Sequence, residues 1–393
     1  MASRAGRRRK DRQRGSDPVT ASRSRTSSTW AALPWATLLV AALCLLGLFS
    51  TEIADTDFWW HLKTGQYIAQ HHALPLPDPF AYALPSAAAA PGEAQVRHFN
   101  LTHEWLSQLL MYEVYTAAGF PGIILVRAAL LTTLCALSGF LAARLSCPSS
   151  HENSLLRIPS EPEAGPTAPS SEIQGKARCA DSAMNVRRLY TGIVAAAAAA
   201  SLLVEFAADR PGIVSFLGAA VFICLLELRR GWWALPPLAL LWANCHGGFV
   251  MGWIVLAAYC AESLILRRDR RLWPIAALAI AISGINPNGF GVVSTILAYR
   301  QSALTANLIE WRPPRLWGEP YNFDLLLYAS ALVLILSWKK VRPAHWLLFA
   351  AFAAASLTAF RNTPLIAFLS PVLIAAYFAS SWKAVVKSRL PDI

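Results

Sequence analysis

The chain has 393 residues, of which 55% are hydrophobic and only 15% are charged, and its formal net charge at pH 7 is +12. A soluble domain carries about 25% charged residues, so this composition excludes an ordinary soluble globular protein and indicates an integral membrane protein. The positive charge does not indicate a nucleic-acid partner, because much of it lies in residues 1–30, where nine Lys and Arg stand against two Asp.

The N-terminal 30 residues form a polar, basic tail that is disordered in character. A cleavable signal peptide has a short basic region before its apolar stretch, whereas this tail is long, so we expect the apolar run at 31–51 to stay as a membrane anchor. A basic tail beside a membrane helix is typical of a cytoplasmic segment that contacts anionic lipid.

The rest of the chain is dominated by apolar runs. A helix needs about 20 apolar residues to cross the hydrocarbon core. Segments near that length lie at 31–51, 121–145, 190–208, 211–228, 232–248, 249–266, 272–287, 320–338, 343–360 and 362–381. The sequence therefore predicts an all-α polytopic membrane protein with about ten transmembrane helices.

The basic residues between these runs predict the orientation. If the tail is cytoplasmic and each run crosses once, the inner face receives the basic clusters at 229–230, 267–271, 339–342 and 383–389. This distribution satisfies the positive-inside rule, so both termini are expected in the cytoplasm, with the protein in the inner (plasma) membrane.

The stretch from His103 to Gly119, "HEWLSQLLMYEVYTAAG", is short for a span and carries Glu113. Counting it as a span would turn the later basic clusters outward, so we interpret it as an amphipathic helix on the outer surface. Residues 31–145 then hold the first span, a long acidic outer loop with juxtamembrane helices, and the second span. A flexible cytoplasmic insertion follows at 146–189, then an eight-helix membrane region at 190–381 and a cytoplasmic tail at 382–393.

The seven cysteines are scattered, without the paired spacing of a zinc site or a disulfide framework. Polar residues, in contrast, gather on the predicted outer face, where a polar cavity would explain them. These residues are Glu52, Asp55, Asp57, His61, Lys63, His103, Glu104, Glu205, Asp209, Arg210, Asn244, His246, Asn286, Asn288, Glu310, Arg312, Arg361 and Asn362.

The stretch "ADTDFWWHLK" carries the most compact acidic group. Asp55 and Asp57 are two residues apart, an arrangement that suits a divalent cation or a general base. The alternative is a pair of solvated loop acids. We accept that solvated interpretation for four other acids: Asp78, Glu93, Glu319 and Asp324.

A series of blocks in order resembles the GT-C superfamily of membrane glycosyltransferases. The blocks are "ADTDFWWHLKTGQYI", "LPLPDPFAY", "THEWLSQLLMY", "ADRPG", "LWANCHGGFVMG", "INPNGFG", "IEWRPP" and "FRNTPL". The resemblance as a whole covers about residues 31 to 380. The resemblance implies a first outer loop with an acidic motif and two juxtamembrane helices, which "FWWHLKTGQYIAQHH" and "HEWLSQLLMYEVYTAAG" fit.

The resemblance also implies the reaction: transfer of a sugar from a polyprenyl-phosphate donor to a glycan, lipid or protein acceptor on the extracytoplasmic face. Such a reaction needs a base and a cation for the departing phosphate. Asp55 and Asp57 are the candidate catalytic residues. The candidates for donor-phosphate binding are Arg210, Arg361 and Lys63, and the candidate supporting residues are Glu52, His61, His103, Glu104 and His246. A divalent cation, Mg²⁺ or Mn²⁺, is a cofactor that some members of the superfamily use.

Structural interpretations stand beside these roles. The histidines lack the spacing of a metal motif, which favours hydrogen-bonded residues over ligands. Arg210 and Arg361 could equally anchor helix ends at the membrane surface. Arg127, inside an apolar run, requires a carboxylate or a phosphate as its partner, and we prefer pairing with Glu104 or Glu113 to binding of a phosphate. Glu205 and Asp209 share a helix face beside Arg210, which predicts a local salt bridge.

Two other classes of function compete with the transferase. A transporter or flippase for a lipid-linked saccharide would also need a polar region beside lipid, and a non-catalytic membrane assembly partner could have the same fold. A transporter places ionisable residues near the midplane of the membrane. Here they gather at one face, which favours the enzyme.

Overall fold

The computed structural model describes residues 27–80, 93–146, 171–301, 308–318 and 322–389, and every regular element within them is helical. The tail before residue 27 and residues 147–170 of the predicted insertion lie outside the described part. The α-helices are α1 (Ser27–Phe49), α2 (Asp57–His71), α3 (Glu93–Thr102), α4 (Trp105–Leu145), α6 (Ser171–Leu203), α7 (Gly212–Leu228), α8 (Leu235–Cys245), α9 (Val250–Ile265), α10 (Leu272–Ser283), α11 (Val292–Gln301), α13 (Phe323–Leu336), α14 (Pro343–Thr358) and α15 (Pro364–Arg389).

Four stretches are long and apolar enough to cross a membrane: Trp105–Leu145, Met184–Phe206, Gly247–Ile265 and Pro364–Lys383. Six further apolar helices are shorter, and α10 has 12 residues. At 1.5 Å per residue, 12 residues span about 18 Å, less than the roughly 30 Å of hydrocarbon. An all-helical chain with several candidate spans is confirmed, whereas ten crossings remain a prediction. Helix α6 begins within the segment predicted as an insertion.

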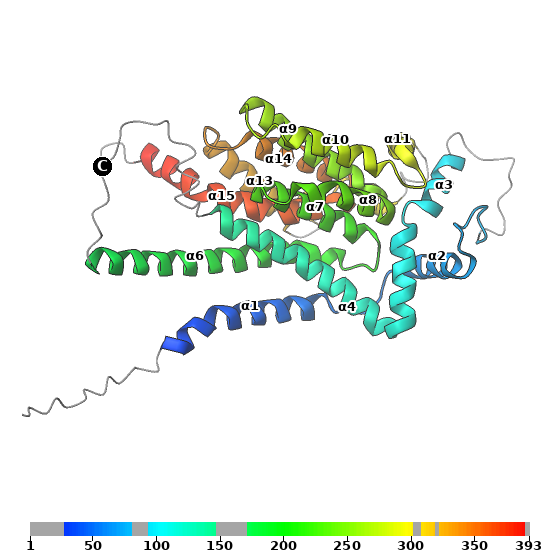
Figure 1. Ribbon diagram of the computed structural model, residues 1–393, viewed down its shortest axis with the longest axis horizontal. Coiled ribbons are helices and arrows are strands. Elements are labelled where there is room, and N and C mark those ends of the chain that lie inside the picture. Colours follow the sequence, from blue (N-terminus) through cyan, green and yellow to red (C-terminus); the bar gives the residue numbers. More distant parts are fainter. Residues whose placement is uncertain (1–26, 81–92, 147–170, 302–307, 319–321, 390–393) are drawn as a thin grey trace, which may run out of the picture.

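Helix α4 is bent, and the bend separates the predicted surface helix from the predicted span. Gly119 has φ 61° and ψ −156°, which is not helical, and Pro121 follows. Proline lacks an N–H donor and disfavours helical backbone in the residue before it. Figure 1 shows the first arm of α4 beside α2 at one end of the bundle, while the second arm runs along the bundle with α6. The helix therefore bends at the residue where the predicted surface helix ends, and the division into surface helix and span stays a prediction.

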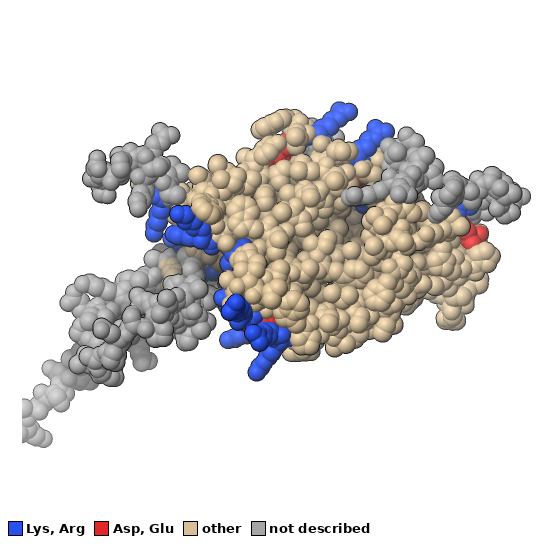
Figure 2. All heavy atoms as spheres, turned by 90° about the horizontal axis from the view of Figure 1, so that it is seen from above, with Lys and Arg blue, Asp and Glu red and all other residues tan. Residues whose placement is uncertain are grey.

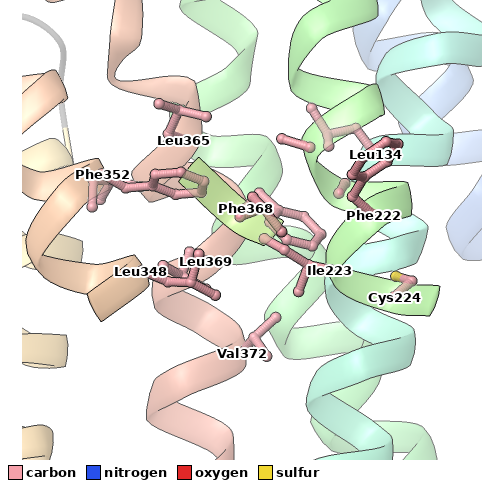
Figure 3. Close-up of a cluster of buried hydrophobic side chains, with 14 of the residues drawn as sticks. Leu134, Phe222, Ile223, Cys224, Leu348, Phe352, Leu365, Phe368, Leu369 and Val372 are labelled. Carbon is pink, nitrogen blue, oxygen red and sulfur yellow. The ribbon is translucent and has the colours of Figure 1, made fainter. Parts of the chain in front are cut away.

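The core is formed where α4, α7, α14 and α15 meet (Figure 3). Leu134, Phe222 and Phe352 are almost completely buried there. Close packing also depends on small residues: a Cβ atom on Gly139 of α4 would lie 2.5 Å from the carbonyl oxygen of Gly192 on α6. In a lipid environment, such close contact between helices supplies much of the association energy.

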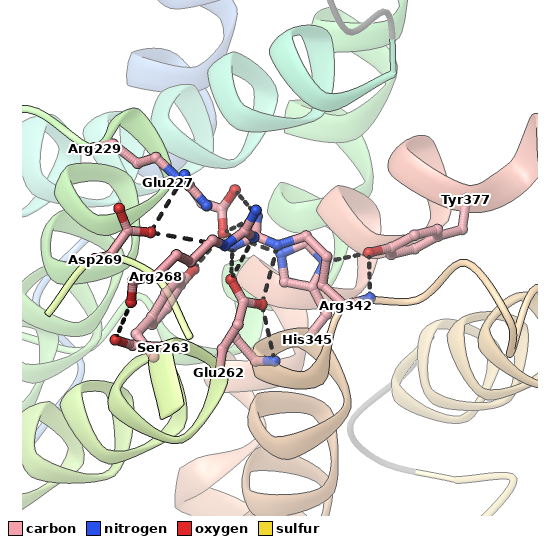
Figure 4. A network of polar contacts seen from close by, with 11 residues as sticks. Glu227, Arg229, Glu262, Ser263, Arg268, Asp269, Arg342, His345 and Tyr377 are labelled. Atoms are coloured by element: carbon pink, nitrogen blue, oxygen red, sulfur yellow. Dashed lines mark hydrogen bonds and ion pairs between the residues drawn. The ribbon is translucent and has the colours of Figure 1, made fainter. Parts of the chain in front are cut away.

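The two ends of the bundle differ in charge. Figure 2 shows most of the visible Lys and Arg side chains towards the end where α6 begins. Within that end lies a buried ionic network (Figure 4): Arg342 donates to both carboxylate oxygens of Glu227, at 2.9 and 2.8 Å, and to Oε1 of Glu262, at 2.6 Å. His345 lies 3.1 Å from the same Glu227. Arg342, expected as an inner-loop charge, therefore joins α7, α9 and α14.

Candidate functional site

The two aspartates of the acidic motif meet Arg210 at the opposite end of the bundle. Asp55 lies between α1 and α2, Asp57 begins α2, and Arg210 lies just before α7. Arg210 binds Asp55 through two nitrogens, Nε to Oδ2 and Nη2 to Oδ1 at 3.0 Å, and its Nη2 lies 2.9 Å from Oδ2 of Asp57. The backbone N–H of Asp57 donates to Oδ1 of Asp55 at 3.0 Å, so the start of α2 holds both carboxylates against one guanidinium.

A third acid and a second arginine extend this group, which we call the acidic cluster (Asp55, Asp57, Arg210, Glu310, Arg361). Glu310 accepts from Arg210 Nη1 at 2.7 Å and from Arg361 Nη1 at 3.1 Å. The Arg361 guanidinium lies over the Trp311 ring, 4.7 Å from its centre. Three carboxylates against two guanidiniums leave the cluster with one net negative charge.

The two aspartates differ in environment. The side chain of Asp55 is 8% exposed and that of Asp57 is 54% exposed. Burial alone would raise the pKa of Asp55, but the hydrogen bonds from Arg210 and from the Asp57 N–H lower it overall. The carboxylates in turn raise the pKa of Arg210 against the effect of burial. Asp55 therefore stays ionised as a permanent partner of Arg210, while Asp57 faces solvent.

A separate group of histidines surrounds Glu104, between α3 and α4. We call it the histidine cluster (His61, His103, Glu104, His246). Oε1 of Glu104 lies 3.1 Å from His103 Nε2 and 3.3 Å from His246 Nε2, and Oε2 lies 3.3 Å from His61 Nδ1. Burial would raise the pKa of Glu104, but the imidazoles, with His103 first, lower it overall, so the carboxylate is ionised. Burial lowers the pKa of His61.

The "HGG" turn holds the histidine cluster together by close backbone approach. A Cβ atom on Gly247 would lie 2.5 Å from the Phe99 ring and 3.0 Å from His103 Cδ2. A Cβ atom on Gly248 would lie 2.4 Å from Ser215 Oγ. Both positions therefore require glycine.

Stacked rings connect the two clusters. Trp311 stacks on Tyr299 with centres 5.2 Å apart, Tyr299 contacts Phe99 edge-on at 6.2 Å, and Phe99 stacks on His103 at 4.2 Å. Together with Arg361 over Trp311, these rings place both clusters on one side of the same end of the molecule.

Among the described residues, one group has its potential metal ligands within 4.8 Å of one another: His103, Glu104 and His246. Asp55 and Asp57 do not belong to it. Arg210 already occupies both oxygens of Asp55 and one of Asp57, so this pair does not fit a prepared site for Mg²⁺ or Mn²⁺.

The structure thus brings most of the predicted site residues together in two groups. Four of the ten belong to the acidic cluster: Asp55, Asp57, Arg210 and Arg361. Another four form the histidine cluster: His61, His103, Glu104 and His246. Two residues lie apart from both: Lys63 is exposed and donates to Gln66 at 2.8 Å, and Glu52 is exposed before α2. Glu310, which joins the two arginines, was listed with the polar residues of the predicted outer face but not with the candidate site residues, because its partners lie at distant positions in the sequence.

Three local expectations are wrong. Arg127 pairs with Asp209, at 2.5 Å with both side chains buried, and not with Glu104 or Glu113. It also donates to the carbonyl of Phe49, at the end of α1, at 3.3 Å. Asp209 is therefore not the partner of Arg210. Asp324, expected as a solvated acid, is buried and accepts from the N–H of Trp317.

Comparison with known protein families, with curated proteins and with solved structures found no match for this chain.

Proposed function

We propose that the chain is a GT-C-type membrane glycosyltransferase that moves a sugar from a polyprenyl-phosphate donor to an acceptor hydroxyl at the end of the bundle that holds the acidic cluster. Four apolar helices of spanning length support the membrane setting. The acidic motif of the first outer loop, which belongs to one of the blocks that carry the resemblance, lies against Arg210 in the folded chain, and Glu310 joins Arg210 to Arg361.

The observation that carries this proposal is the exposed carboxylate of Asp57 beside the guanidinium of Arg210. Asp57 takes the proton of the acceptor hydroxyl, the acceptor oxygen attacks the first carbon of the sugar, and the bond from that carbon to the phosphate oxygen breaks. The electron pair leaves with the polyprenyl phosphate, whose charge the arginines stabilise.

Asp55 and Glu310 position the arginines in this scheme. A donor phosphate that binds Nη2 of Arg210 replaces the Asp57 carboxylate there, which frees Asp57 to act as the base. Arg361 lies on the other side of Glu310 and offers a second guanidinium for the same phosphate. Because the pair Asp55 and Asp57 does not fit a prepared Mg²⁺ or Mn²⁺ site, no step is routed through a cation at these residues.

We also propose the topology that the charges indicate. Both termini lie in the cytoplasm, ten segments cross the inner membrane, and the acidic cluster faces outward. The ends of α7 and α9 and the start of α14 meet in the network around Arg342. The start of α7 and the turn from α14 to α15 are joined at the other end through Glu310, which binds both Arg210 and Arg361. This grouping of helix ends agrees with a chain whose successive helices cross the membrane in opposite directions.

The test is donor turnover by the purified protein in liposomes supplied with a panel of polyprenyl-phosphate sugars. Asp57→Asn should lower the turnover rate by about a hundredfold or more, which is the effect expected when a general base is lost. Arg361→Lys should raise the donor concentration at which turnover is half-maximal, because lysine cannot replace a planar guanidinium in binding the phosphate. Glu113→Gln, an exposed acid on the first arm of α4, is the matched control and should retain activity.

Equal turnover by wild type and Asp57→Asn would reject Asp57 as the base. No turnover of any donor by the wild-type protein, with labelled lipid moving between leaflets, would replace the transferase with a flippase.

A further inference from the structure

We propose that His103, Glu104 and His246 form a binding site for one divalent transition metal ion, for which Zn²⁺ is the best suited. The inference rests on the histidine cluster alone and does not depend on the sugar transfer proposed for the acidic cluster.

The spacing of the three ligand atoms fits a tetrahedral ion. Glu104 Oε1 lies 3.1 Å from His103 Nε2 and 3.3 Å from His246 Nε2, and all three atoms lie within 4.8 Å of one another. Zinc bonds to imidazole nitrogen and carboxylate oxygen are about 2.0–2.2 Å long, which puts neighbouring ligands of a tetrahedron about 3.3 Å apart. Small movements of the His103 and His246 side chains would therefore complete the set.

His103 has the arrangement expected of a metal ligand. Its Nδ1–H donates to the carbonyl oxygen of Phe99 at 2.7 Å, and its ring stacks on the Phe99 ring. This leaves the Nε2 lone pair directed at the Glu104 carboxylate, an arrangement that requires a proton or a cation between the two atoms. A histidine that binds metal through one nitrogen and donates the other N–H to a backbone carbonyl is a recurrent feature of metal sites.

His246 has a second partner that can accept its ring proton. Its Nδ1 lies 2.6 Å from Ser215 Oγ and accepts from the backbone N–H of Gly248 at 3.0 Å, so in this arrangement the proton is on Nε2. Metal binding at Nε2 moves that proton to Nδ1, where Ser215 Oγ accepts it, and the Gly248 contact opens. Trp242 Nε1 donates to the same Ser215 oxygen at 2.9 Å, which fixes its position.

Glu104 supplies the negative charge, and His61 orients it. His61 Nδ1 lies 3.3 Å from Oε2 of Glu104, the carboxylate oxygen that the other two imidazoles do not approach within ion-pair distance, and an Nδ1–H there donates to it. His61 therefore acts as an outer partner of the carboxylate rather than as a fourth ligand. Three protein ligands leave one position open for water or a substrate atom, as in His₂Glu zinc sites.

The donor set favours Zn²⁺ over Mg²⁺ or Mn²⁺. Two imidazoles and one carboxylate suit nitrogen-preferring transition metals, whereas Mg²⁺ prefers oxygen ligands and several waters. A bound ion would join the junction of α3 and α4 to the turn between α8 and α9, which are 143 residues apart in sequence (246 − 103). Metal binding is thus expected to stabilise the fold as well as to fill the site.

The test uses the full-length protein in detergent, freed of metal with a chelator and dialysed. Reloading with Zn²⁺ should give one tightly held ion per chain by elemental analysis, and Co²⁺ in its place should give the strong visible bands of a four-coordinate site. His103→Ala, His246→Ala and Glu104→Gln should each abolish the Co²⁺ spectrum. His71→Ala, at an exposed histidine of α2, is the matched control and should bind like wild type.

Ser215→Ala provides a test that leaves all three ligands in place. Loss of an outer partner lowers metal affinity about 10–100-fold, so this variant should bind Co²⁺ more weakly by that factor while its spectrum keeps the same shape. Zn²⁺ should also raise the unfolding temperature of wild type and not that of Glu104→Gln. Metal uptake by His103→Ala and Glu104→Gln equal to that of wild type, or no uptake by wild type, would overturn the proposal.

Discussion

Arg210 shows how single residues organise the candidate site. Its guanidinium contacts Asp55, Asp57 and Glu310 at once, through all three of its nitrogens. A lysine carries one ammonium group and cannot reproduce this planar arrangement. The geometry of the acidic cluster therefore depends on an arginine at this position.

Asp55→Asn should lower the free energy of unfolding by about 1.5–3 kcal/mol at neutral pH, the range for a hydrogen bond to a charged group. The pKa of Asp55 lies below its ordinary value of 3.8 in the folded chain. The stabilisation that ionised Asp55 gives to the folded chain is therefore complete well above pH 3.8. It is lost as the pH falls through the lowered pKa of the folded state.

Thermal unfolding in detergent at several pH values measures this effect. The difference between wild type and Asp55→Asn should be constant from pH 7 to about pH 5 and should narrow below about pH 4. A difference that widens on acidification would contradict the proposed pairing with Arg210.

At the scale of elements, the end of the bundle that holds the acidic cluster includes α2 and the first arm of α4, which pack together. Gly65 of α2 lies so close to α4 that a Cβ atom there would be 2.0 Å from the carbonyl oxygen of Gln108. Gly119 then turns α4 by adopting a φ of 61°. These two glycines have different roles, since one permits close packing and the other permits the bend.

Gly65→Ala should destabilise the protein by about 1–3 kcal/mol, because the clash is with backbone that must shift. The matched control is Gly47→Ala on α1, where a Cβ atom would meet nothing within 4 Å. That control should be neutral or slightly stabilising. Equal unfolding temperatures for the two variants would show that α2 does not pack against α4 in this way.

Gly119→Ala should cost about 1–3 kcal/mol, the range for a residue held in a sparsely populated backbone conformation. Ala117→Ser, at an exposed position two residues earlier, should have little effect. Thermal unfolding of the two variants measures the difference. If α4 were straight in solution, Gly119→Ala would instead be stabilising.

At the scale of the whole molecule, two polar groups connect the helices at opposite ends of the bundle. Arg342 joins α7, α9 and α14 at one end, and Arg127 joins α4 to Asp209 and to the end of α1 at the other. Breaking one partner of a buried ion pair costs about 3–5 kcal/mol. Glu227→Gln, which weakens the contacts to Arg342 and His345, should therefore unfold at a much lower temperature than Glu113→Gln.

The topology has its own test. A membrane-impermeant thiol reagent applied to intact spheroplasts should label Glu113→Cys, on the first arm of α4. It should label Lys339→Cys, at the opposite end, only after permeabilisation. Labelling of both from one side would reject the proposed arrangement of the two ends.

The sequence by itself determined the apolar runs that become helices, the end of the predicted surface helix at Gly119, and the set of polar residues from which the candidate site is drawn. These follow from local composition and backbone preference. Only the tertiary structure decided the pairings. Asp55 and Arg210 are 155 residues apart, and Arg127 and Asp209 are 82 apart. A charged side chain pairs with the groups that helix packing brings near it. The periodicity of the sequence within a helix does not predict which residues of other helices those are.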